Sequence, residues 1–215
     1  MDAEAGGLRG ACGSLQRVKV SWSRGSIAVY VNSCTYPPSD DTILLLEAME
    51  ALRREGRVYG SALDLGTGNG ALALGAVEVL GVRRVAAVDA YPCPALAARA
   101  TLPPQALVAV CPYASCLKGG FDIALVNPPY LPEKPPPPGG QGCSPTLSEA
   151  WAGEGVMRGM LEAAGRLAGE VLTVYSSLSS VTPQEVLGAM GFSTRILASE
   201  RFFMERLEVV HAWRS

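Results

Sequence analysis

The sequence predicts one α/β domain, in which helices alternate with the strands of a mainly parallel sheet and a hairpin ends the chain. Two stretches carry this prediction. An apolar run at 61–65 leads through a glycine-rich turn, 66–70, into a helical stretch, and a second apolar run at 121–126 stops at two prolines. Because ligands of open α/β sheets bind beyond the carboxyl ends of the strands, both stretches are expected to face one site.

The composition indicates an ordinary globular protein. The chain has 215 residues, of which 48% are apolar, enough to bury a full core and too few for two comfortable domains. Its net charge of -2 argues against strong reliance on phosphate contacts. No apolar run approaches the roughly 18 residues of a membrane span, and the acidic start lacks the apolar core of a signal peptide. We therefore expect a cytoplasmic protein.

The cysteines do not form a metal-binding pattern. There is no Cys-x-x-Cys pair, and the single histidine, His211, lies in the last predicted strand, where we expect a structural role. We therefore predict no metal site, and expect the cysteines to be small buried side chains with a few exposed thiols. Disulfides are expected only in unusual intracellular settings. The six cysteines are Cys12, Cys34, Cys93, Cys111, Cys116 and Cys143.

The motif Asn-Pro-Pro-Tyr at 127–130 follows the buried strand directly. Asn127 offers a side-chain carbonyl, Pro128 offers a backbone carbonyl that no neighbouring strand is expected to use, and Tyr130 offers a flat ring. A planar NH2 group could donate its two hydrogens to these carbonyls while it lies on the ring. The motif therefore predicts binding of an amide or an exocyclic amine.

The glycine-rich turn predicts a nucleotide-like ligand, because glycines remove the Cβ atoms that would block a close approach of the backbone. A glycine turn alone is a weak signal. A second apolar strand ends at Asp89, about 20 residues past the turn, where a carboxylate can accept both hydroxyls of a ribose. The alternative for Asp89 is a capping or turn-forming aspartate, and we favour ribose binding.

The remaining elements follow from periodicity and capping residues. Residues 1–14 are expected to form a loose arm, which precedes a hairpin laid over the main domain, and residues 131–142 form either a lid over the site or a disordered insertion. The tripeptide 139–141 of this loop is Gly-Gly-Gln. The expected strands lie at 15–20, 26–31, 105–110, 170–175, 192–197 and 206–213, and the expected helices begin at Ser39, at Pro94, near residue 152 and at Thr182.

The motifs together resemble the class I S-adenosylmethionine-dependent methyltransferases. The resemblance rests on residues 64–70 (Asp-Leu-Gly-Thr-Gly-Asn-Gly), Asp89 and the motif at 127–130, in this order and spacing. Within that superfamily, residues 36–42 and 149–153 resemble the HemK-type protein glutamine methyltransferases, in their short archaeal and eukaryotic branch. The resemblance extends from about Tyr36 to the C-terminus.

The resemblance implies a Rossmann-like seven-stranded sheet, mostly parallel, with a C-terminal antiparallel hairpin and helices on both faces. It divides the chain into an N-terminal arm and hairpin, 1–35, and a methyltransferase domain, 36–215. It also implies N5-methylation of the glutamine in the Gly-Gly-Gln motif of a peptide-chain release factor, with Asn127, Pro128 and Tyr130 as catalytic residues. S-adenosylmethionine would be held by Thr42, Asp64, Gly66, Gly68, Asp89 and Asn127.

The resemblance further implies a small zinc-binding activator subunit, which pairs with the edge strand expected at 105–110. An apolar edge strand favours such an interface, although the chain's own loops could also cover it. In one departure from the family pattern, Pro112 stands where an acidic residue commonly receives the adenine amino group. Adenine recognition is therefore expected to rest on backbone groups near Tyr113 or on shape.

Two other functions fit the same motif. The exocyclic amine of adenine is also planar, so N6-methylation of RNA or DNA is possible, although the acidic pI of about 5.5 counts against it. A tetrahedral lysine amine fits the two acceptors less well. The third possibility, a binding module without turnover, would require a defective site, whereas the motif at 127–130 is intact.

Overall fold

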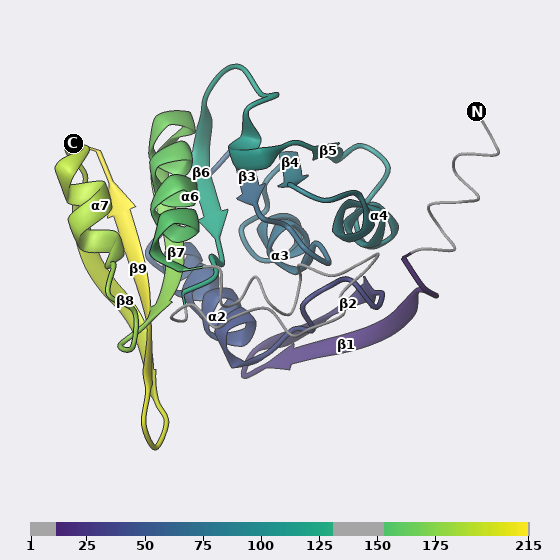
Figure 1. Ribbon diagram of the computed structural model, residues 1–215, viewed down its shortest axis with the longest axis horizontal. Helices are drawn as coiled ribbons and strands as arrows, with labels where there is room; N and C mark the ends of the chain where they lie inside the picture. The colour runs from purple at the N-terminus through teal and green to yellow at the C-terminus, as the bar shows by residue number, and fades with distance from the viewer. Residues whose placement is uncertain (1–11, 131–152, 215) are drawn as a thin grey trace.

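The computed structural model describes residues 12–130 and 153–214 (Figure 1). Its main sheet has seven strands in the order β5-β4-β3-β6-β7-β9-β8. Neighbouring strands from β5 to β7 are parallel, and β9 is antiparallel to both β7 and β8. The expected fold class is thus confirmed. The strands are β3 (Ser61–Leu65), β4 (Arg84–Asp89), β5 (Leu107–Val110), β6 (Phe121–Val126), β7 (Ala168–Ser176), β8 (Ser193–Arg201) and β9 (Arg206–Trp213).

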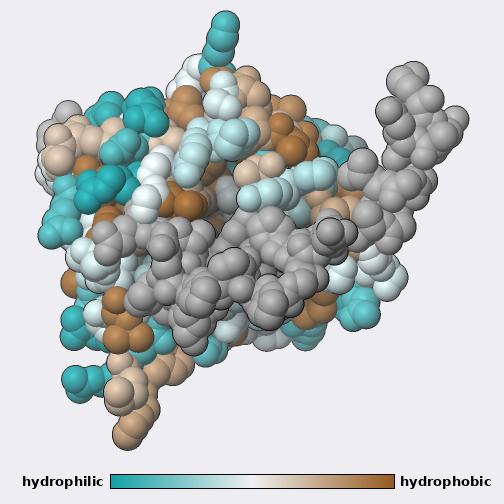
Figure 2. Space-filling view, in the orientation of Figure 1, coloured by the Kyte–Doolittle hydropathy of each residue, from teal (hydrophilic) through white to brown (hydrophobic). Residues whose placement is uncertain are grey.

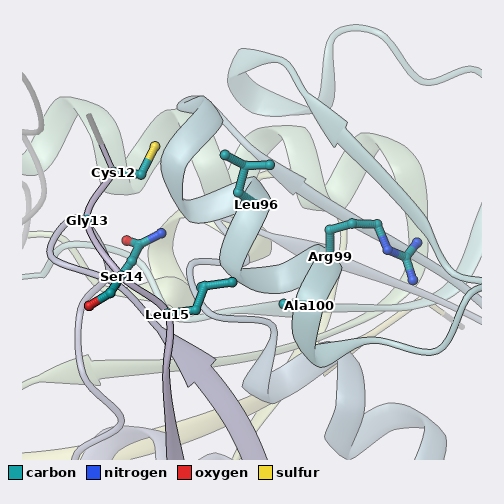
Figure 3. A pocket seen from close by; sticks show the side chains of 8 residues that line it. Cys12, Gly13, Ser14, Leu15, Leu96, Arg99 and Ala100 are labelled. Carbon is teal, nitrogen blue, oxygen red and sulfur yellow. The ribbon is translucent and has the colours of Figure 1, made fainter. Parts of the chain in front are cut away.

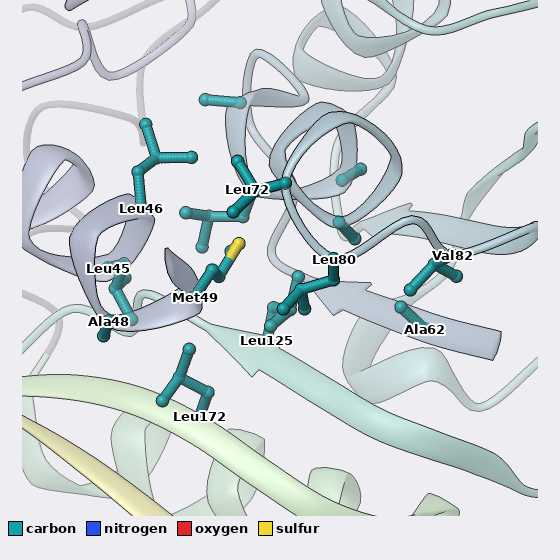
Figure 4. Packing of buried hydrophobic residues seen from close by; sticks show 14 of the residues in the cluster. Leu45, Leu46, Ala48, Met49, Ala62, Leu72, Leu80, Val82, Leu125 and Leu172 are labelled. Carbon is teal, nitrogen blue, oxygen red and sulfur yellow. The ribbon is translucent and has the colours of Figure 1, made fainter. Parts of the chain in front are cut away.

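Helices cover the sheet on both faces, because alternate strand residues point to opposite sides. Leu125 of β6 packs into a core cluster with α2 and α3, shown in Figure 4, whereas the adjacent Val126 packs with α6 and α7. Both faces of β6 are therefore buried, as its unbroken apolar run predicts. The helices are α2 (Asp40–Arg54), α3 (Ala71–Glu78), α4 (Pro92–Thr101), α6 (Gly153–Leu167) and α7 (Pro183–Ala189), with a 3-10 turn, η1 (Pro112–Ala114).

The predicted N-terminal hairpin is present as a separate two-stranded sheet of β1 (Gln16–Trp22) and β2 (Gly25–Val31). Val29 is completely buried in the cluster that contains α2. The backbone N–H of Tyr30 donates to Thr101 Oγ1 at 2.8 Å, which fixes β2 to the end of α4. The hairpin therefore lies on the main domain. The division of the chain at residue 35 stays a prediction.

The expectation that the cysteines are thiols is wrong for the described part of the chain. Disulfides join Cys12 to Cys93 and Cys111 to Cys116, and Cys34 is also disulfide-bonded. The first bridge ties the segment before β1 to the start of α4, which lies 81 positions along the chain. Sequence spacing did not reveal these pairs, because their partners meet only once the hairpin and η1 have folded.

The Cys12–Cys93 bridge is expected to contribute substantially to stability, since it closes a long loop in the unfolded chain. Replacing both residues by serine should lower the free energy of unfolding by about 2–4 kcal/mol. Urea unfolding of the parental and double-variant proteins would measure this loss. Parental protein treated with a reductant should approach the double variant, and equal unfolding midpoints under all conditions would contradict the prediction.

Several boundaries differ from the expected ones. The strand expected at 105–110 begins only at Leu107, because the N–H of Ala106 bonds to Pro103 in a turn. The last hairpin is longer than expected, since β8 continues to Arg201. The capping box predicted at Thr182 is present, whereas Ser39 occupies the N-cap position of α2 without a side-chain bond. The loop expected at 131–142, its Gly-Gly-Gln tripeptide and residues 149–152 lie outside the described residues.

None of the helices in the described segments is both long and apolar enough to pass through a bilayer.

Candidate active site

The predicted site residues meet at the carboxyl edge of the sheet. Leu65 on β3 pairs with Val126 on β6 and with Val88 on β4. The next residues along the chain, respectively Gly66, Asn127 and Asp89, therefore lie at the same level, where Gly66 and Asn127 follow the ends of β3 and β6 and Asp89 is the last residue of β4. The shared edge follows from parallel pairing, and it brings the glycine turn next to the Asn-Pro-Pro-Tyr motif.

The glycine turn has a backbone that favours glycine. Gly66 and Gly68 adopt φ angles of +76° and +55°, in the left-handed region. The N–H groups of Gly66 and Thr67 both donate to the carbonyl of Val88, at 2.8 and 2.9 Å, which holds the turn against β4. A Cβ at Gly68 would have no atom within 4 Å, so this glycine borders open space.

Asp89 lies beside this open space with part of its hydrogen-bonding capacity in use. Its Oδ2 accepts from the N–H of Gly68 at 2.9 Å, and its Oδ1 accepts from the N–H of Tyr91 at 3.0 Å. Burial raises the pKa of Asp89, while these two bonds favour the carboxylate. A carboxylate has about four acceptor positions, so acceptor capacity remains for ribose hydroxyls.

Asp64, the fourth residue of β3, is a buried carboxyl with one oxygen unused. Its Oδ2 accepts from Thr67 Oγ1 at 2.6 Å and from the N–H of Ala73 at 2.9 Å. Its Oδ1 has no partner among the described residues, although it is buried. Burial raises the pKa of Asp64 to about 7. A buried acceptor without a donor is costly, which makes this position suitable for a cationic ligand group.

The Asn-Pro-Pro-Tyr motif combines a partly exposed amide with a fixed ring. Among the described residues, no group bonds to the Asn127 side chain or to the Pro128 carbonyl, and Asn127 is partly exposed. The hydroxyl of Tyr130 donates to Asp41 Oδ2 at 3.0 Å, and its ring packs against both core clusters. Burial, together with the Asp41 carboxylate, raises the pKa of Tyr130, so this hydroxyl remains a donor.

Asp41 contacts two predicted site residues, a connection that sequence reasoning missed. Its position in the first turn of α2 suggested only an interaction with the helix dipole. In the structure it is buried, and it joins two predicted site residues, because its Oδ1 accepts from the N–H of Thr42 at 2.6 Å and its Oδ2 accepts from Tyr130. Thr42 therefore lies next to the motif, with its hydroxyl also directed to Asp41 at 3.2 Å. No local signal marks this contact, which spans 89 positions.

The loop after β5 lies against α6. A positive φ of 52° directs Tyr113 toward this helix, where a Cβ at Gly159 would come within 2.9 Å of the ring. The disulfide between Cys111 and Cys116 closes the loop that contains Tyr113. Pro112 offers no side-chain acceptor, as expected, and the contacts to adenine stay a prediction.

A cavity of about 600 Å³ lies elsewhere, between the N-terminal segment and α4 (Figure 3). None of the predicted site residues lines it. Its arginine, Arg99, is already committed, because its guanidinium donates to the carbonyls of Leu102 and Ala106, among others. We therefore do not assign the active site to this cavity. It is lined by Cys12, Gly13, Ser14, Leu15, Asn32, Leu96, Arg99 and Ala100.

His211 lies apart from the site, as expected. It is completely buried on β9, and its Nε2 lies 2.7 Å from Glu170 Oε2 near the start of β7. Tyr59 donates to the same oxygen at 2.7 Å, and Arg57 pairs with the other at 3.0 Å. This cluster joins the sheet to the segment before β3 and has a structural role.

Known proteins show the same fold and related sequences. No family model matches the chain. Methyltransferase HEMK2 of Mus musculus is 29% identical over 169 residues, which cover 70% of this chain and 72% of that protein. A release factor glutamine methyltransferase of Vibrio cholerae is 35% identical over 117 residues, 52% of this chain but only 40% of its own length.

Two solved structures share the fold at lower identity. One is the E. cuniculi Mtq2-Trm112 complex, described as methylating the translation termination factor eRF1, with a TM-score of 0.60 and 22% identity over 84% of this chain and 99% of that chain. The other is the 16S rRNA methyltransferase RsmC of T. thermophilus in complex with AdoMet and guanosine, with a TM-score of 0.69 and 19% identity over 94% of this chain and 51% of that chain.

The sheet order is that of the class I methyltransferase fold, which RsmC shares with this chain. The sequence relatives carry narrower names. The chain is similar to Methyltransferase HEMK2 over 70% of its length and to a release factor glutamine methyltransferase over 52% of its length.

Binding of S-adenosylmethionine is expected to depend on pH through Asp64. The pKa of Asp64 is raised to about 7, so this carboxyl is largely protonated below pH 7, and a cationic ligand favours its charged form. Affinity should therefore fall by up to about tenfold for each pH unit below 7 and level off above it. Calorimetric titration between pH 5.5 and 7.5 would measure this slope.

The Asp64→Asn variant is the matched control for this titration, since it keeps the shape of the side chain and removes its proton equilibrium. It should bind the cofactor more weakly, with a much smaller slope below pH 7. A parental affinity that stays constant over this range would contradict the role given to Asp64.

Proposed function

We propose that the chain methylates N5 of the glutamine in a Gly-Gly-Gln motif of a peptide-chain release factor. The observation that carries this proposal is the partly exposed Asn127 amide, which has no partner among the described residues, in the same motif as the fixed Tyr130 ring and next to the glycine turn. A planar carboxamide matches this arrangement. The names of the two sequence relatives and the description of the E. cuniculi complex support the same substrate class.

The residues of the glycine turn fit the methyl donor. Gly68 borders open space and permits a close approach of the backbone, Asp89 has acceptor capacity left for ribose hydroxyls, and Asp64 has a buried oxygen for a cationic group. When bound, S-adenosylmethionine supplies a methyl group on a positively charged sulfur. Thr42 is expected to line the same pocket from α2, since Asp41 holds it beside the Asn-Pro-Pro-Tyr motif.

Asn127 and Pro128 are proposed to position the substrate nitrogen. An amide nitrogen is a poor nucleophile, because its lone pair is delocalised into the carbonyl. The Asn127 side-chain carbonyl and the Pro128 carbonyl would accept its two hydrogens and direct the lone pair at the methyl carbon. The same acceptors stabilise the positive charge that develops on nitrogen, and the proton is lost afterwards. Tyr130, held by Asp41, would support the plane of the amide.

Adenine N6 methylation is the competing function. The surroundings of the site favour a protein substrate, because carboxylates lie close to the motif. Asp41 bonds to Tyr130, and the charge of Glu205 reaches both Tyr36 and Tyr130. A nucleic-acid phosphate would be repelled by these groups, and the chain has a net charge of -2.

We also propose a small activator subunit, zinc-binding as in the family branch that the sequence resembles, on the edge strand β5. This strand is at the end of the sheet and has four residues. Leu107 and Val110 are each 50% exposed, which is unfavourable for an unpaired edge. A partner strand would cover these side chains and complete the hydrogen bonds of the edge. We place the enzyme in the cytoplasm, where release factors act.

Methylation assays would test the proposed function directly. The chain is incubated with S-adenosylmethionine and either a release factor, the same factor with its motif glutamine replaced by glutamate, or an adenine-containing RNA and DNA. We expect a gain of one methyl group on the motif glutamine alone, located by mass spectrometry. Methylation of the nucleic acids, or of the factor that lacks the glutamine, would contradict the proposal.

A further inference from the structure

The tip of the β8–β9 hairpin projects from the same edge of the sheet as the active site (Figure 1). Val126 is level with Thr173 on β7, and Thr173 is level with Val210 on β9. Met204 precedes Val210 by six positions. At about 3.3 Å per residue, the tip therefore lies about 20 Å beyond the level of Val126, the residue before the Asn-Pro-Pro-Tyr motif.

Two large apolar side chains occupy this tip without packing. Phe203 is 100% exposed and Met204 is 77% exposed, whereas the adjacent Phe202 packs against the core. Figure 2 shows the tip as an apolar projection at the lower left of the molecule. A fully exposed aromatic ring and a largely exposed thioether add little buried apolar area to the isolated chain. Such exposed side chains mark contact surfaces.

The backbone beneath these side chains is well held. The N–H of Phe202 donates to the carbonyl of Glu205 at 2.7 Å and closes the turn. Arg206 and Ser177 exchange two bonds, from the Arg206 N–H to the Ser177 hydroxyl at 3.0 Å and from the Ser177 N–H to the Arg206 carbonyl at 2.8 Å. The hairpin base is thereby fixed to the end of β7, so the tip is preorganised for contact.

Glu205, which adjoins Met204 in the turn, acts electrostatically on the catalytic motif. Burial, then the carboxylate of Asp41 and more weakly that of Glu205, raise the pKa of Tyr130. Glu205 has the same effect on the pKa of Tyr36, which burial and Asp41 also raise. A molecule whose reactive group lies at Asn127 thus extends past Glu205 before it meets Phe203.

We propose that Phe203 and Met204 dock an apolar patch on the surface of the folded protein substrate, about 20 Å from its reactive glutamine. This proposal rests on the function proposed above and adds a second contact, which selects a whole protein over an isolated motif. A nucleic acid is a poor occupant, because Glu200 and Glu205 balance the charges of Arg201 and Arg206 around the tip.

The double variant Phe203→Ser/Met204→Ser tests the docking surface with two substrates. One is the whole release factor, and the other is a pentapeptide with the motif glutamine at its centre, which reaches only about 7 Å to either side of that residue. We expect kcat/KM for the whole factor to fall about tenfold to a hundredfold, mainly through KM. The pentapeptide should react at the parental rate, since it does not reach the tip.

Val58→Ser is the matched control. Val58 is 89% exposed and precedes β3 at the opposite edge of the sheet, so its loss should change neither reaction. An unchanged KM for the whole factor in the double variant would overturn the proposal. An equal loss on the factor and on the pentapeptide would also overturn it, because the tip would then act within the catalytic site.

Direct binding separates this inference from the proposed function. The affinity of the whole factor is measured for the parental chain and the double variant without cofactor. Binding that is at least tenfold weaker in the variant supports docking, even if the factor is never methylated, in which case the proposed function alone fails. A parental chain that neither binds nor methylates the factor overturns both.

Discussion

Replacing Asn127 by alanine is expected to abolish methyl transfer. The side chain supplies one of two acceptors for the substrate NH2 group, and among the described residues it has no structural partner that its loss would disturb. Loss of one positioned group of this kind costs about 10²–10³ in kcat, and the loss of alignment adds to it. We expect kcat to fall at least about 10³-fold in single-turnover assays with the release factor.

The controls for this variant separate chemistry from binding. Asn127→Ala should retain most of its affinity for S-adenosylmethionine and unfold at the parental temperature. Tyr130→Phe keeps the ring and removes only the bond to Asp41, so we expect a loss of about tenfold. Transfer at the parental rate by Asn127→Ala would exclude the catalytic assignment of the motif.

The second large effect is expected at Asp89. Its carboxylate has acceptor capacity left for ribose hydroxyls, and hydrogen bonds to a charged group contribute about 1.5 kcal/mol or more each. Asp89→Ala should therefore weaken cofactor binding by about 100-fold or more, measured by calorimetry. The loss includes a loosening of the glycine turn, because the N–H of Gly68 loses its acceptor.

Asp89→Asn serves as the matched variant. It keeps one carbonyl acceptor and the shape of the side chain, so its cofactor affinity should lie between the parental and alanine values. A parental affinity in both variants would show that Asp89 is only a capping residue. Its bond to the N–H of Tyr91, two positions later, is the kind of contact that such a residue makes.

The central fold was predictable because its signals are local. The apolar run Phe121–Val126 is buried on both faces, as its composition indicates, and the two prolines after it end the pairing with β7 at Val126. The meeting of Gly66, Asp89 and Asn127 follows from one rule, since parallel strands present their carboxyl ends at one edge. The sequence therefore sufficed to predict that these residues meet at one edge of the sheet.

Contacts between distant segments were not predictable in this way. The bond between Asp41 and Tyr130 spans 89 positions, and the bridge from Cys12 to Cys93 spans 81. The length of β8 was missed for a related reason. Its polar end has little intrinsic preference for a strand, and it is extended because Arg201 pairs with Arg206 on β9.

The bridge between Cys111 and Cys116 has a practical consequence for enzymology. It encloses Tyr113 in a small covalent ring. The ring begins at Cys111, one residue past the end of β5, and Tyr113 lies next to α6. Dithiothreitol, a common additive in protein buffers, would open this ring. Assays with and without the additive would then compare two covalently different enzymes, so the oxidation state must be fixed by counting thiols before any rate is assigned.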